Sequence, residues 1–180
     1  GGSFAKALKQ ADPNIYIYGY DRSGITDQAL LDKSINEKLE SIDHSLAADL
    51  IFLCLPIDDS IEAFRNLYPR LKSGQILSDF CSVKKIFAEE SEKISSEGIY
   101  IGAHPMTGKE KSGFDNSDLL LFENSIFITC TTNQNDEKLK LFIDFIKLTG
   151  ARVTLLEAHL HDRIVSKVSH LPQLLSVLLV

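Results

Sequence analysis

The sequence predicts an α/β protein of the doubly wound type, in which helices cover both faces of a parallel sheet. Short apolar runs alternate with segments of helical periodicity along most of the chain. Several runs are continuously apolar, as expected for strands that are buried on both faces. The length of 180 residues suits one domain and the beginning of a second.

Apolar runs bounded by turn residues give the predicted strands. The first run is rich in β-branched and aromatic residues, and the second is continuously apolar up to Pro56. A turn that contains glycine precedes each of the next two runs. The predicted strands are 15–20, 50–55, 76–80, 99–103, 125–131 and 152–156.

Apolar residues at helical spacing give the predicted helices between these strands. An amphipathic helix begins at Phe4, and a long helical stretch begins at Ala158 with a kink expected near Pro172. The other predicted helices are 60–71, 83–94 and 136–148, the last with Asp136 as a candidate N-cap. We therefore expect a dinucleotide-binding domain over 1–157 and the start of an all-α dimerisation domain over 158–180.

Both ends of the sequence suggest a window on a longer chain. The first helix follows Gly1-Gly2-Ser3 directly, although a strand normally precedes such a turn. The segment 171–180 holds seven aliphatic residues in ten, a patch that would seek a partner surface. The alternative is a natural terminus on an obligate oligomer.

Composition and charge exclude several classes of protein. The chain is 44% apolar and 24% charged, which excludes disordered and disulfide-scaffold proteins. The net charge of −6 gives no basic surface for nucleic acid or an anionic membrane. No signal peptide is recognisable, and no apolar run approaches the roughly 20 residues of a spanning helix. The sequence therefore predicts a soluble, cytoplasmic protein that binds neither nucleic acid nor membrane.

A glycine-rich turn and an acidic residue suggest a nucleotide site. Asp21 closes the first predicted strand, 20 residues after Gly1, which is the spacing of a Rossmann-type fold. Gly1, Gly2 and Ser3 would place a pyrophosphate at the helix N-terminus. The Asp21 carboxylate would bind ribose hydroxyls and repel a 2′-phosphate, favouring NAD, although Arg22 weakens that preference. The alternative is that Asp21 only opens the turn 21–24.

Chemistry is expected where the strands end, because ligands bind at the carboxyl edge of such sheets. Leu55 and Pro56 end the second strand and are candidate cofactor contacts. His104 ends the fourth strand, and a polar loop with glycine, 106–113, follows it. Ser82 leaves a neighbouring strand on the same edge. A Ser–His nucleophile pair is conceivable, but beside a nicotinamide His104 fits better as the base for a hydroxyl proton.

The other histidines divide by their surroundings. His44 lies in a polar connection and is expected to be solvated. His159, His161 and Asp162 are residue types that bind metals, but residues two apart, such as 159 and 161, do not share a helix face. We therefore predict no metal site. His170 interrupts an apolar helix, where it either points into a cleft or is a satisfied core histidine.

Several blocks together resemble one family. The HPM…G.E.SG block, 104–113, and the SHLP block, 169–172, are specific to prephenate dehydrogenases, whereas the glycine motif is not. The resemblance runs in order over essentially the whole chain. The matching blocks are GGSFAKAL at 1–8, YGYD at 18–21, DFCSVK at 79–84, GAHPM at 102–106 and VSHLP at 168–172.

The resemblance implies a reaction and its residues. Such enzymes carry out the NAD-dependent oxidative decarboxylation of prephenate to 4-hydroxyphenylpyruvate on the route to tyrosine, or act on the amino counterpart arogenate. His104 matches the catalytic histidine, and Ser82 matches the serine that hydrogen-bonds it. Other residues fall where family members contact or gate the substrate: Glu110, Ser169, His170 and Gln173.

Departures from the family pattern leave alternatives open. Some relatives have histidine where this chain has Gln173, so the choice between prephenate and arogenate is not decided, and Lys109 replaces a small or hydroxyl residue. The helical dimerisation domain, which implies a homodimer, and the arginine for a substrate carboxylate lie outside this sequence. A chain ending at Val180 is therefore expected to be inactive alone. The competing interpretations are a non-catalytic dinucleotide-binding module and a dehydrogenase for another hydroxy acid.

Overall fold

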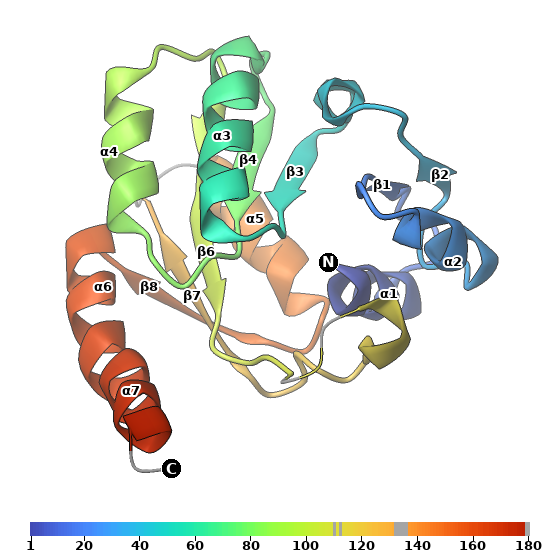
Figure 1. Ribbon diagram of the computed structural model, residues 1–180. Coiled ribbons are helices and arrows are strands. Elements are labelled where there is room, and N and C mark those ends of the chain that lie inside the picture. Colours follow the sequence, from blue (N-terminus) through green and yellow to red (C-terminus); the bar gives the residue numbers. More distant parts are fainter. Residues whose placement is uncertain (110, 112, 132–136, 179–180) are drawn as a thin grey trace.

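The computed structural model describes residues 1–109, 111, 113–131 and 137–178, with the backbone alone for His170 and Gln173. Its strands form three small sheets, in the orders β1-β2, β3-β4-β5 and β6-β7-β8. Figure 1 shows helices α3 and α4 on one face of the central strands and α5 on the other. This layering confirms the predicted α/β class.

The N-terminal part contains α1 (Gly2–Ala11), β1 (Tyr18–Gly19), α2 (Ile25–Leu31) and β2 (Glu37–Lys38). β1 pairs with β2 in parallel. The strand predicted over 15–20 is shorter than expected. The backbone N–H of Ile17 donates to the side chain of Asn36 at 2.9 Å, so regular pairing begins only at Tyr18.

The central sheet follows the predicted pattern closely. Its strands are β3 (Leu50–Leu53), β4 (Ile76–Asp79) and β5 (Ile99–Tyr100), all parallel. Between them lie α3 (Ile57–Leu67), which continues as a 3₁₀ turn (Tyr68–Arg70), and α4 (Lys85–Lys93). A further 3₁₀ turn (Ile42–Ala47) precedes β3. Because the strands are parallel, their carboxyl ends lie at one edge, as predicted.

The third sheet departs from an all-parallel arrangement at one pair. It contains β6 (Gly102–Pro105), β7 (Ile126–Cys130) and β8 (Arg152–Leu156), and α5 (Glu137–Lys147) connects the last two. β7 is antiparallel to β6 and parallel to β8. The described residues between β6 and β7 contain a 3₁₀ turn (Phe114–Asn116) but no crossover helix, so the chain reverses direction. The predicted N-cap Asp136 lies outside the described residues.

The C-terminal part is one continuous helical stretch. It comprises α6 (Ala158–Val165), a π-helical turn (Ser166–His170) and α7 (Leu171–Leu178). The π-helical turn ends two residues before Pro172, and the kink expected near that proline stays a prediction. The helices of the described part are all too short or too polar to cross a membrane. The division into domains at residue 157 stays a prediction.

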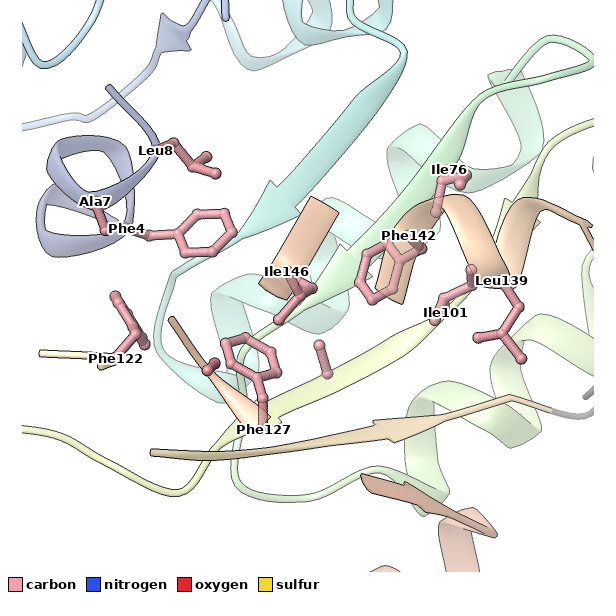
Figure 2. Packing of buried hydrophobic residues seen from close by; sticks show 12 residues of the cluster. Phe4, Ala7, Leu8, Ile76, Ile101, Phe122, Phe127, Leu139, Phe142 and Ile146 are labelled. Carbon is pink, nitrogen blue, oxygen red and sulfur yellow. The ribbon is translucent and has the colours of Figure 1, made fainter. Parts of the chain in front are cut away.

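The core fixes the start of α1 against the sheet. The ring of Phe4 lies 5.0 Å from those of Phe52 and Phe80 and 5.6 Å from that of Phe122, edge to face. Figure 2 shows Phe4 directed from α1 into the cluster that α5 and β7 complete. Aromatic contacts of this kind add about 0.5–1.5 kcal/mol per pair beyond the buried area. The first turn of α1 is therefore held rigidly at the sheet edge.

Candidate active site

The predicted phosphate-binding residues lie at the N-terminus of α1. Gly1 is the N-cap, and no side chain in the described part caps this helix, so its first amides lack a side-chain acceptor. A Cβ at Gly2 would approach the ring of Phe114 to 2.9 Å, so glycine allows the loop to pack there. Ser3 Oγ accepts a hydrogen bond from the backbone N–H of Asp118 at 3.0 Å. Unsatisfied amides at a helix N-terminus favour an anion.

Two adjoining cavities bring all the predicted cofactor residues together. The larger, of about 810 Å³, lies between β1 and β3, which are not paired with each other in the described part of the chain. The smaller has a volume of about 280 Å³. We call both together the nucleotide crevice. Gly1, Gly2 and Ser3 line the larger cavity, Arg22 and Pro56 the smaller, and Asp21 and Leu55 both.

Asp21 takes part in the turn that the alternative interpretation proposed. Its Oδ1 accepts the backbone N–H of Ser23 at 2.7 Å and also the Ser23 hydroxyl. Both bonds use one carboxylate oxygen, so the turn and a ribose contact through Oδ2 are compatible. Arg22 pairs with Asp59 at 3.1 Å, which balances the positive charge beside Asp21.

His104 is held by a partner that the sequence analysis did not find. The imidazole is buried at the end of β6, and its Nδ1 lies 2.9 Å from Nε2 of His161. Nδ1 of His161 lies 2.7 Å from Oδ1 of Asp162. His159 is exposed and His161 buried, so the two do not share a face, as predicted. In the sequence, His161 and Asp162 stood out only as candidate metal ligands.

Asp162 connects this pair of histidines to α4. Its Oδ1 accepts the backbone N–H of Lys84 at 2.7 Å, and its Oδ2 accepts that of Lys85 at 3.0 Å. Burial raises the pKa of Asp162, but the hydrogen bonds from His161 and the two amides outweigh it and lower the pKa overall. Burial lowers the pKa of His161, against the opposing effect of Asp162. The carboxylate is therefore ionised and the imidazole neutral near pH 7.

A buried ion pair between Lys84 and Asp79 lies beneath the loop that carries Ser82. Lys84 and Asp79 are each 0% exposed and bind through Nζ and Oδ1. The Tyr100 hydroxyl donates to Oδ2 of Asp79 at 2.6 Å, and the Cys81 N–H donates to Oδ1 at 2.9 Å. Burial, with Asp79 nearby, raises the pKa of the Cys81 thiol to about 11. The loop between β4 and α4 is thus fixed from below, and Ser82 is exposed on it.

The predicted substrate contacts are only partly within the described structure. Glu110 lies outside the described residues, as do the side chains of His170 and Gln173. Ser169 is half-buried in the π-helical turn. Lys109, which departs from the family pattern, pairs with Asp118 at 3.0 Å.

Comparison with known proteins identifies the family. Residues 4–155 match the family model described as prephenate dehydrogenase, nucleotide-binding domain. A prephenate dehydrogenase of Lactococcus lactis is 32% identical over 183 aligned residues, covering 100% of this chain and 50% of the relative. A cyclohexadienyl dehydrogenase of Zymomonas mobilis is 27% identical, covering 100% of this chain and 62% of the relative.

Solved structures agree with the sequence relatives. Prephenate dehydrogenase from Aquifex aeolicus, in complex with hydroxyphenyl propionate and NAD+, superimposes with a TM-score of 0.88 at 30% identity. That match covers 99% of this chain and 63% of the other. Synechocystis arogenate dehydrogenase gives a TM-score of 0.87 at 28% identity, covering 99% of this chain and 64% of the other. The chain thus spans about half to two thirds of the length of these proteins, and it belongs to the prephenate dehydrogenase family as a nucleotide-binding domain.

Proposed function

We propose that the full-length protein is an NAD-dependent dehydrogenase that converts prephenate to 4-hydroxyphenylpyruvate by oxidative decarboxylation, on the route to tyrosine. The observation that carries this proposal is the placement of His104. It is a buried imidazole held through Nδ1 at the carboxyl end of β6, and Asp21 and Leu55 of the nucleotide crevice likewise follow the carboxyl ends of β1 and β3. Family membership and the printed names of the relatives support the substrate class.

The residues of the crevice fit NAD. The uncapped first turn of α1 suits the pyrophosphate, and Asp21 suits the ribose hydroxyls of the adenosine half. Arg22, balanced by Asp59, presents little net charge to a 2′-phosphate. Leu55 and Pro56 offer apolar surface in the same crevice. When bound, NAD⁺ supplies the hydride acceptor.

The protein's part in the chemistry is to orient the ring and to hold one proton. Prephenate carries a ring hydroxyl and, across the ring, a carboxylate. As the C–H electrons leave as hydride, the hydroxyl carbon becomes a carbonyl and His104 takes the hydroxyl proton. Loss of CO₂ then makes the ring aromatic, and His104 returns the proton to the phenol oxygen. Aromatisation drives the reaction, so positioning is the main task of the enzyme.

The remaining predicted contacts complete the proposal. Ser82, which is exposed on the loop between β4 and α4, aligns the substrate with the nicotinamide. Ser169, His170 and Gln173 bind the substrate, and Glu110 gates the cleft. Arogenate is the alternative substrate, which the name of the Synechocystis relative, an arogenate dehydrogenase, supports.

We further propose a homodimer formed through the helical C-terminal part. Large apolar side chains are exposed along α6 and α7, which is unusual for a solvated helix. Sedimentation of the full-length protein, compared with a variant bearing Leu175→Glu and Leu178→Glu, would test this. Dissociation of the variant supports the proposal, and a monomeric wild-type protein contradicts it. The exposed residues are Leu160, Ile164, Val168, Leu171, Leu174, Leu175, Val177 and Leu178.

The reaction is tested by following reduced-nicotinamide absorbance when the full-length protein meets NAD⁺ with prephenate, and separately with arogenate. A signal with either substrate supports the dehydrogenase, and the ratio of rates assigns the substrate. A folded protein that binds NAD⁺ but is silent with both would instead be a non-catalytic dinucleotide-binding module.

Replacing His104 tests its assignment as the base. His104→Asn removes the proton acceptor, so turnover should fall by about 10²–10⁴-fold while the dissociation constant of NAD⁺ stays nearly unchanged. Single-turnover rates and equilibrium titration measure the two quantities. Full turnover in the variant would show that His104 is not the base.

A further inference from the structure

Two residues outside the predicted site, His161 and Asp162, connect His104 to the start of α4. We propose that Asp162 and His161 form a hydrogen-bond relay that fixes His104 with its proton on Nδ1 and makes Nε2 the proton acceptor. His161 and Asp162 are then positioning residues, because they act through His104 and not on the substrate. The catalytic consequence rests on the proposed function, whereas the tautomer itself does not.

The relay begins at a carboxylate that accepts hydrogen bonds and donates none. Asp162 accepts the backbone N–H groups of Lys84 and Lys85 at the start of α4. Two amides and the positive end of a helix dipole stabilise the ionised form. A protonated Asp162 would lose at least part of this arrangement, because backbone amides can only donate.

The carboxylate of Asp162 then determines which ring nitrogen of His161 carries the proton. Oδ1 of Asp162 lies 2.7 Å from Nδ1 of His161, so Nδ1 must carry a proton and donate it. The opposite tautomer would set a ring lone pair against a carboxylate oxygen. His161 is 0% exposed, which disfavours a second proton on the ring. Its Nε2 therefore presents a lone pair.

His161 in turn determines which ring nitrogen of His104 carries the proton. Its Nε2 lies 2.9 Å from Nδ1 of His104, which must therefore donate. A neutral imidazole with Nδ1 protonated has its lone pair on Nε2, the form that a general base requires. When His104 takes a proton, its Nδ1–H bond to His161 is kept, and the charge of Asp162 stabilises the imidazolium through the intervening ring. Asp162 itself need not take up the proton.

Two substitutions of His161 separate this role from simple packing. His161→Gln places an amide oxygen near the position of Nε2, within reach of Nδ1 of His104. The side chain in His161→Asn is one methylene shorter than in His161→Gln. It places its amide near the position of Nδ1 of His161 and therefore loses the contact with Nδ1 of His104. His159→Gln is the matched control, because His159 is an exposed residue on the same helix.

The tautomer is read directly from histidine ¹⁵N chemical shifts in the full-length protein labelled with ¹⁵N-histidine, with His104→Asn used for assignment. We expect His104 to be the Nδ1–H tautomer in the wild-type protein, in His159→Gln and in His161→Gln. In His161→Asn we expect a mixture of tautomers. The turnover number should fall about 10–100-fold in His161→Asn and only a few-fold in His161→Gln, with the KM values little changed.

The outcomes distinguish this proposal from the function on which its consequence rests. An Nε2–H tautomer of His104 in the wild-type protein would overturn the relay, whatever the activity. Unchanged turnover and tautomer in His161→Asn would do the same. A wild-type protein with the Nδ1–H tautomer but no turnover would keep the relay and reject the proposed reaction. If His161→Asn does not fold, the wild-type and His161→Gln spectra still decide.

Discussion

The two ends of the candidate site hold their polar groups in different ways. In the nucleotide crevice, the side chain of Arg22 is 71% exposed and that of Asp59 36%, and among the described residues Asp21 bonds only within its own turn. Beneath the loop between β4 and α4, Asp79, Lys84 and His161 are each 0% exposed and bond to other protein groups. The crevice thus keeps polar atoms available for a ligand. In the buried group, the polar atoms bond to one another and fix a single arrangement.

The free energy that is lost when one partner of an ion pair is removed depends strongly on whether the pair is buried. An exposed ion pair contributes little because water solvates each partner almost as well. A buried ion pair does not necessarily stabilise the fold, but removal of one partner leaves the other charge unsolvated. The comparison therefore predicts that equivalent substitutions have unequal effects at the two ends.

The largest difference is expected between Lys84→Met and Arg22→Met. Lys84→Met leaves the buried carboxylate of Asp79 without its counter-ion and should lower the free energy of unfolding by about 3–5 kcal/mol. Arg22→Met removes a partner of the exposed Asp59 and should leave stability unchanged within error. Urea denaturation of both variants measures the change in the free energy of unfolding. Similar losses in the two variants would contradict the predicted difference between the buried and the exposed ion pair.

The next effect concerns ligand binding in the crevice. Asp21→Ala removes the acceptor for the ribose hydroxyls, so NAD⁺ should bind about tenfold or more weakly, with less effect on NADP⁺. Titration of each cofactor measures the preference. Ser23→Ala is the matched control, because it removes the hydroxyl bound to Asp21 but keeps the carboxylate. A preference that Asp21→Ala leaves unchanged would refute the ribose contact.

The smallest effect is a dependence of stability on pH that comes from the buried end. Burial lowers the pKa of His161, so the unfolded chain binds its proton more readily than the folded one. Its contribution to stability is complete above the ordinary histidine pKa of about 6.5 and is lost as pH falls below that value. Asp162, whose pKa is also lowered overall, adds a loss at more acidic pH.

His161→Gln should remove the first part of this dependence. The other charged groups near His161, namely Asp162, Lys84 and Asp79, remain in the variant. Free energies of unfolding measured from pH 7.5 to 5 should therefore fall less steeply in His161→Gln than in the wild-type protein. If the free energy of unfolding changes with pH equally in the two proteins, His161 takes up a proton as easily in the folded as in the unfolded chain.

Sequence reasoning predicted the crevice because its signals are local. Gly1 to Ser3 and Asp21 are separated by one helix and one strand, and the spacing alone indicates where they meet. The rule that ligands bind at strand ends then added Leu55 and Pro56, which line the same cavities. The first strand is shorter than predicted, since the Asn36 side chain replaces a backbone partner, and α2 and β2 were not predicted.

The relay could not be predicted in the same way. His104 and His161 are 57 residues apart, and their contact requires α6 to pack against α4 after the antiparallel turn from β6 to β7. No short pattern reports that reversal. The sequence analysis compared His161 with its neighbour His159 instead of with His104. The adjacent acid at 162 was the available signal, because a carboxylate bonded to one ring nitrogen of a histidine determines which nitrogen carries the proton.

The hydrogen bonds of Asp162 have a consequence for heat resistance. The amides that it binds belong to the first turn of α4, and helix ends open before helix centres. Opening of that single turn releases the carboxylate and, with it, the ordered protons of both histidines. The proposed base would therefore lose its fixed tautomer through a local fluctuation, at temperatures where the sheet and its aromatic core are still intact.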